Sequence, residues 1–68
     1  MIEVGRRYIT KCGNIIRCIH RFENDTYLGQ YEKTIEGHES LTGLNQIWQE
    51  NGKWARFPGG IHDIVKAA

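Results

Sequence analysis

The dipeptide Asn51-Gly52 constrains this chain most, because it lies between two short segments that have the composition of β-strands. Residues 47–50 precede it and residues 53–57 follow it, each with a tryptophan. Asn-Gly between two such segments is the strongest short-range signal for a β-hairpin, since both residues tolerate the positive φ that a type I′ turn requires. We therefore expect a hairpin here with a two-residue turn.

Strand and turn signals also follow one another along the first half of the chain. Residues 8–10 and 15–19 flank a turn signal at residues 13–14, and residues 27–31 follow another at residues 24–25. Short strands at such regular spacing are typical of small sheets and barrels. The pattern predicts an all-β fold: a small antiparallel sheet or SH3-like barrel of four to six strands, with at most one short helix.

The length of 68 residues fits one small β domain over residues 1–68. A chain of this size buries only about 60% of the surface that its unfolded form exposes, so its core is small. A bound partner or a homo-oligomer interface would add to that core. Its expected members are mainly aliphatic and aromatic: Ile9, Ile16, Ile19, Leu28, Ile47, Trp48, Trp54, Phe57, Ile61, Ile64 and Val65.

Hydropathy predicts a cytoplasmic protein. No apolar run approaches the roughly 20 residues of a membrane-spanning helix. Residues 1–7 contain no apolar stretch of signal-peptide length. We therefore expect no membrane partner.

The net charge of +1 conceals an uneven distribution of charge. Residues 1–21 carry a balance of +4, residues 22–50 a balance of −5, and the remainder +2. A protein with little net charge can therefore still present a basic face. A solvated sheet surface of mixed charge explains the same distribution without a function.

The first hairpin supplies the nucleic-acid hypothesis. If residues 13–14 form a two-residue turn, Tyr8 lies on the face opposite to Ile16 and shares that face with basic side chains. Cations that contact phosphate and a ring that stacks on a base are the features with which small barrels bind single strands. The predicted nucleic-acid-binding residues are Arg6, Tyr8, Arg17 and Arg21. Arginine stems that merely cover apolar surface are the structural alternative.

The second hairpin supplies a protein-binding alternative. With Asn51-Gly52 as the turn, Trp48 faces Ala55 in the core, and Trp54 lies on the opposite, more exposed face. Aromatic and arginine side chains are frequent anchors of interfaces. The predicted partner-binding residues are Trp54, Arg56, Tyr27 and Tyr31, and an acidic segment over residues 32–39 would face a basic partner.

Neither a metal site nor catalysis is expected. The two cysteines, Cys12 and Cys18, and the three histidines make none of the spacings that chelate zinc, so we predict free thiols and no cofactor. No motif brings a nucleophile together with a base and a residue that orients it, so we predict a binding protein and no enzyme. Residues 34–43 have no clear period and are expected to form a long loop that could include a helical turn.

Residues 4–13 resemble the opening strand of small SH3-like barrel proteins. Together with residues 48–53 and the ending 62–65, the chain resembles small accessory proteins of bacteriophages and prophages. The resemblance implies a role in binding nucleic acid or in inhibiting a host protein, and it implies no catalytic residues. It has no counterpart for residues 34–43, whose role it leaves open.

Overall fold

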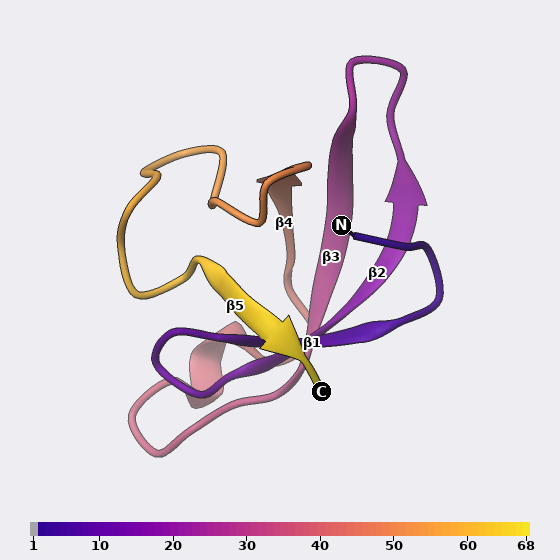
Figure 1. Ribbon diagram of the computed structural model, residues 1–68. Helices are drawn as coiled ribbons and strands as arrows, with labels where there is room; N and C mark the ends of the chain where they lie inside the picture. Colours follow the sequence, from indigo (N-terminus) through magenta and orange to yellow (C-terminus); the bar gives the residue numbers. More distant parts are fainter. Residues whose placement is uncertain (1) are drawn as a thin grey trace.

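The computed structural model describes residues 2–68, which form a single curled antiparallel sheet (Figure 1). The elements in chain order are β1 (Arg7–Thr10), β2 (Ile15–Arg21), β3 (Thr26–Lys33), the 3-10 turn η1 (Glu39–Leu41), β4 (Asn45–Gln49) and β5 (Ile64–Ala67). The strand order is β4-β3-β2-β1-β5, so β5 returns to pair with β1. The sheet curls into a half-barrel, and the segment between β4 and β5 arches across its open side (Figure 1). The predicted all-β fold is confirmed.

All three tight hairpins use a loop of three residues, whereas two residues were expected at Gly13-Asn14 and at Asn51-Gly52. In each loop the third residue has positive φ: 103° at Gly13, 60° at Asp25 and 87° at Gly52. This is the geometry of a tight turn that is followed by a left-handed residue. The residues that flank each loop are joined by a backbone hydrogen bond: Thr10 to Asn14, Phe22 to Thr26 and Gln49 to Lys53, each of 2.8 Å.

The predicted register of the first hairpin is therefore wrong. Tyr8 pairs with Ile16, whereas the two-residue turn would have placed it opposite Ile19. The register moves by an odd number of residues, which transfers every β1 side chain to the other face relative to β2. Tyr8 and Thr10 consequently point into the core, where their exposed fractions are 5% and 1%.

The core lies inside the curl of the sheet and is rich in tyrosine. Besides Ile16 and Trp48, its buried apolar side chains are Ile2, Tyr8, Cys18, Tyr27 and Tyr31. Gly29 lies opposite Gln46, and the Trp48 ring packs so close to it that a Cβ atom at Gly29 would lie 2.7 Å from that ring. The glycine thus makes the space in which the largest core side chain is seated.

The second hairpin exists, but its register is also wrong. Trp48 lies opposite Trp54 and not opposite Ala55, because the loop has three residues. Trp48 is buried as predicted, while Trp54 is half-buried against the same core. Phe57, expected in the core, is 61% exposed. The other expected core residues that lie exposed are Ile19, Ile47, Ile61 and Val65.

The segment between β4 and β5 is held by polar contacts. The buried Asp63 carboxylate accepts the backbone N–H groups of Trp54 and Gly59, each at 2.8 Å. The Trp48 indole N–H donates to the His62 carbonyl at 2.8 Å. Ile64 N–H donates to the Gly52 carbonyl at 2.7 Å, so β5 also contacts the hairpin loop that follows β4.

Candidate functional site

The outer face of the sheet carries a straight row of polar side chains across four strands. Arg7 lies opposite Arg17, Arg17 opposite Gln30, and Gln30 opposite Asn45. Directly opposite residues of paired strands project from the same face, and neighbouring strands lie about 4.8 Å apart. The row therefore runs for roughly 14 Å across the sheet, and its basic end lies on β1 and β2.

A second row lies beside the first. Lys66 is opposite Ile9, Ile9 opposite Ile15, and Ile15 opposite Lys33. Two isoleucines thus separate two lysines, on the same face as the arginine pair. We call the cations of both rows, Arg7, Arg17, Lys33 and Lys66, the basic outer face.

The charges of this surface are only partly compensated. Glu32 is paired with Arg7, with 2.5 Å between the guanidinium Nε and the carboxylate Oε1. Among residues 2–68, no ion pair involves Arg17, Lys33 or Lys66. Like charges directly opposite one another on a sheet are destabilising, and Glu32 offsets this repulsion only at Arg7. A shallow hollow of about 320 Å³ between Arg7, Ile15, Glu32 and Lys33 lies within this surface.

The structure does not bring the predicted nucleic-acid residues together. Arg17 lies on the outer face, but the Tyr8 ring is buried and offers no surface for stacking. Arg6 lines a hollow of about 260 Å³ together with Tyr8 and residues of β5. A register shift between Cys18 and His20 also places Arg21 opposite Tyr27, on the core side of the sheet.

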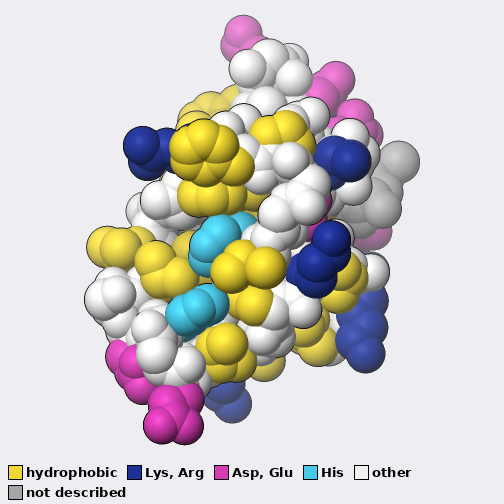
Figure 2. All heavy atoms as spheres, turned by 90° about the vertical axis from the view of Figure 1, so that its left-hand side faces the viewer, with side chains coloured by type: hydrophobic (Ala, Val, Ile, Leu, Met, Phe, Trp, Pro, Cys, Tyr) yellow, Lys and Arg dark blue, Asp and Glu magenta, His cyan; other side chains and the backbone are white. Residues whose placement is uncertain are grey.

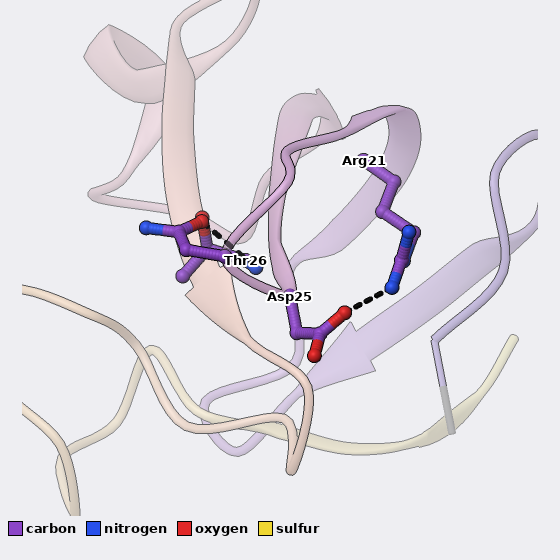
Figure 3. A network of polar contacts seen from close by, with 4 residues as sticks. Arg21, Asp25 and Thr26 are labelled. Atoms are coloured by element: carbon purple, nitrogen blue, oxygen red, sulfur yellow. Dashed lines mark hydrogen bonds and ion pairs between the residues drawn. The ribbon is translucent and has the colours of Figure 1, made fainter.

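Arg21 is further occupied by local contacts at the β2–β3 hairpin. Its guanidinium is paired with the Asp25 carboxylate (Figure 3). The pKa of Arg21 is raised by a hydrogen bond with Tyr27 and by the charge of Asp25. Beside this pair, Asn24 Oδ1 accepts the Thr26 hydroxyl at 2.6 Å, which fixes the hairpin end. The Arg21 side chain thus stabilises the β2–β3 turn through its ion pair with Asp25.

Of the predicted partner-binding residues, two lie in the core and two lie along a groove. Tyr27 and Tyr31 are core residues, with exposed fractions of 4% and 1%, so they are not surface anchors. Burial, and next the nearby Cys12, raise the pKa of Tyr31 to about 12. Trp54 and Arg56 do lie together, along a groove of about 420 Å³ at the outer edge of β4. Trp54 also holds a buried indole N–H that has no hydrogen-bond partner in the described part of the chain.

Aromatic and histidine side chains gather over the open side of the half-barrel. The His62 ring lies 4.7 Å from the Trp54 ring and 6.1 Å from the His38 ring, and its Nδ1 is 3.1 Å from the Tyr31 hydroxyl. Figure 2 shows two neighbouring histidines on this side with hydrophobic side chains around them. Burial, and next the charge of His38, lower the pKa of His62.

A smaller polar network attaches residues 34–43 to the first hairpin loop. Asn14 is fully buried; its Oδ1 accepts the Ile35 N–H at 2.8 Å, which leaves its amide to donate to His38 Nδ1 at 3.0 Å. Cys12 Sγ lies 3.8 Å from the same nitrogen. These contacts fix the first residues of the loop to the hairpin. The same loop contains the 3-10 turn η1.

Both cysteines are free thiols. Burial raises the pKa of Cys18, and a backbone contact with His20 partly offsets this. Cys12 lies in the first loop, next to the Thr10 hydroxyl at 3.4 Å. No group of three or more His, Cys, Asp or Glu side chains within residues 2–68 is arranged to hold a metal ion.

Sequence reasoning missed Arg7, Lys33 and Lys66 as members of one surface. Their association depends on the hairpin register, which places Arg7 opposite Arg17. The signal that could have found it is Gly13, because a glycine in third position indicates a three-residue loop as well as a two-residue one. For Lys66, nothing in the local pattern indicates that β5 pairs with β1.

Comparisons with family models, curated proteins and solved structures give no match to this chain. In the described part of the chain, no helix has the length and apolar character needed to cross a membrane.

Proposed function

We propose that this protein is a non-enzymatic, cytoplasmic binding module of the phage accessory type that binds nucleic acid through its basic outer face. The observation that carries the proposal is the placement of Arg7, Arg17, Lys33 and Lys66 on one side of the sheet. Phosphate groups are the ligand that such an array of separated cations suits best, and contacts to them position a nucleic acid without reading its sequence.

The Arg7–Arg17 pair supports the same proposal. Two arginines in a directly opposed pair cost stability in the free protein, and a phosphate between them would relieve the repulsion. Glu32 neutralises only one of the two. The acidic residues of the segment 34–43, Glu36 and Glu39, belong to a loop and not to this sheet surface.

The test is a titration of labelled DNA and RNA oligonucleotides at several salt concentrations. The affinity should fall steeply between 50 and 200 mM salt, by about tenfold for each two to three phosphate contacts. Arg17→Ala should weaken binding to every sequence and reduce the slope of log K against log salt by about 1. Arg21→Ala, which removes the same charge from the other side of the sheet, is the matched control and should leave affinity nearly unchanged.

Glu32→Gln gives a prediction of opposite sign. Removing the carboxylate that pairs with Arg7 should raise the affinity for oligonucleotides, a result that a generally damaged fold would not produce.

Loss of affinity in Arg21→Ala but not in Arg17→Ala would contradict the proposed surface. Absence of oligonucleotide binding, with capture of one host protein from a nuclease-treated lysate, would favour the inhibitor or adaptor hypothesis.

A further inference from the structure

The groove at the outer edge of β4 continues the row that begins on the basic outer face. Asn45, the last residue of the row Arg7–Arg17–Gln30–Asn45, also lines this groove. The groove therefore adjoins the outer face at Asn45, whereas Trp54, which lies opposite the inward-facing Trp48, borders it from the side of the core. A strand of nucleic acid that contacts the arginines would reach the groove by crossing β3.

The lining of the groove combines flat apolar walls with polar groups. Its apolar side chains are Leu28, Ile47, Trp54 and Ala55. The lining residues with polar side chains are Asn45, Gln46 and Arg56. Gln46 lies opposite Gly29, so the amide of Asn45 is the one that shares the outer face with the row. Apolar walls suit the faces of a nucleobase, amides suit its hydrogen-bonding edge, and a cation suits the adjoining phosphate.

The backbone of β4 adds further hydrogen-bonding groups. The Ile47 carbonyl accepts the Ala55 N–H at 3.0 Å, so Ile47 directs its backbone groups away from β3. Alternation along the strand directs those of Asn45 the same way. The Ile47 N–H and both backbone groups of Asn45 have no backbone partner among residues 2–68, and they border the groove.

An extended peptide is the other occupant that an open strand edge invites. The free stretch of β4 is short, however. Leu44 already donates to the Leu41 carbonyl at 2.9 Å and accepts from Tyr31 at 3.0 Å, and Ala55 occupies the edge beyond Ile47. Three unpaired groups are too few to pair an added strand, but they match the donors and acceptors of a single base.

We infer that the ligand is a single-stranded nucleic acid, and that one unstacked base enters the groove beside Trp54 while its backbone follows the row to Arg17 and Arg7. The inference rests on the proposed function and makes it more specific. A duplex keeps its bases stacked and paired, so it can use the basic outer face but not the groove.

The experiment compares a single-stranded oligonucleotide with its duplex, by affinity and by tryptophan fluorescence. The single strand should bind about tenfold more tightly and should quench fluorescence; the quenching should disappear in Trp54→Phe. Asn45→Ala and Arg56→Ala should reduce single-strand affinity to the duplex level and leave duplex affinity unchanged. Lys53→Ala, which removes a cation from the same hairpin outside the groove lining, is the matched control. Thermal melts verify that each variant is folded.

The outcomes separate the two proposals. Equal affinity for single strand and duplex, dependent on Arg17 and without a Trp54 signal, would overturn the groove assignment and leave the proposed function standing. Loss of all oligonucleotide binding would overturn both. Quenching of Trp54 by an acidic extended peptide and not by the oligonucleotide would identify the groove as a peptide site.

Discussion

Asp63 organises the segment that spans the open side of the half-barrel. Its two carboxylate oxygens accept the N–H groups of Trp54 and Gly59, which lie nine and four residues before it in the chain. The buried carboxylate thus satisfies two part-buried backbone donors of this segment. The position of Trp54, and hence of one groove wall, therefore depends on a residue that does not line the groove.

Asp63→Ala should lower the free energy of unfolding by about 2 kcal/mol, because two backbone donors lose their acceptor. Asp63→Asn keeps one carbonyl oxygen and should lose less. Urea unfolding at neutral pH measures both changes as shifts in the midpoint at constant slope. Identical midpoints for Asp63→Ala and the unmodified protein would show that the segment does not need the carboxylate.

At the scale of elements, the three-residue hairpin loops decide which side chains share a face. Gly52 has a φ of 87°, and a Cβ atom there would lie 3.2 Å from the Ile64 carbonyl oxygen. Gly59 has a similar φ of 91° but open space around it. Substitution of Gly52 and of Gly59 therefore distinguishes two contributions to the free energy of unfolding: the strain of a positive φ, which both share, and the contact with Ile64, which only Gly52 has.

Gly52→Ala should destabilise the fold by about 1–3 kcal/mol, since it combines a strained φ with a contact against β5. Gly59→Ala carries only the strain and should cost about 1 kcal/mol. Thermal denaturation of both variants gives the comparison. If the two variants melt together, crowding against Ile64 contributes nothing and the loop of the second hairpin adjusts freely.

The existence of the hairpins could be predicted from the sequence, but their register could not. Asn51-Gly52 indicates a turn, yet the same dipeptide fits a two-residue loop and the last two positions of a three-residue loop. A change of one residue moved Trp54 to the side of Trp48. The predicted nucleic-acid site depended on register in the same way: Arg17 lies on the outer face, but Tyr8 lies in the core.

The composition of the core could be predicted only in part. The expected core included Ile16 and Trp48, which are buried, but no tyrosine or cysteine. Three tyrosines and a cysteine join them, because inner positions of β1, β2 and β3 fall on Tyr8, Cys18, Tyr27 and Tyr31. A tyrosine hydroxyl can be buried where a polar partner exists, as His62 provides for Tyr31. Such partners lie far apart in sequence and leave no local signal.

At the scale of the whole molecule, His62 joins segments from different parts of the chain. Its ring contacts Tyr31 of β3, His38 of the long loop and Trp54, and Asp63 follows it directly in the chain. Burial and the His38 charge lower its pKa below the ordinary 6.5, and Asp63 opposes them. Below that ordinary value the unfolded chain takes up a proton that the folded protein resists, so acidification favours unfolding.

Stability should therefore fall as the pH is lowered from 7.5 to 5, through the range just below 6.5. His62→Gln keeps an acceptor for the Tyr31 hydroxyl and should show a smaller fall. Melting temperatures of both proteins across this range provide the measurement, and the difference between them isolates His62 from the other titrating groups. An equal or steeper fall in His62→Gln would assign the acid sensitivity elsewhere.

The pairing of β1 with β5 has a kinetic consequence. Each of the pairs β1–β2, β2–β3 and β3–β4 joins neighbours in the chain, whereas Tyr8 and Ala67 come together from opposite ends of it. Closing so long a loop costs chain entropy before any contact compensates for it. The four-stranded meander can thus form early, while Lys66 reaches Arg7 and Arg17 only in the last step. The cationic surface would then be complete only in the fully folded chain, so that partially folded molecules would present a weaker positive potential.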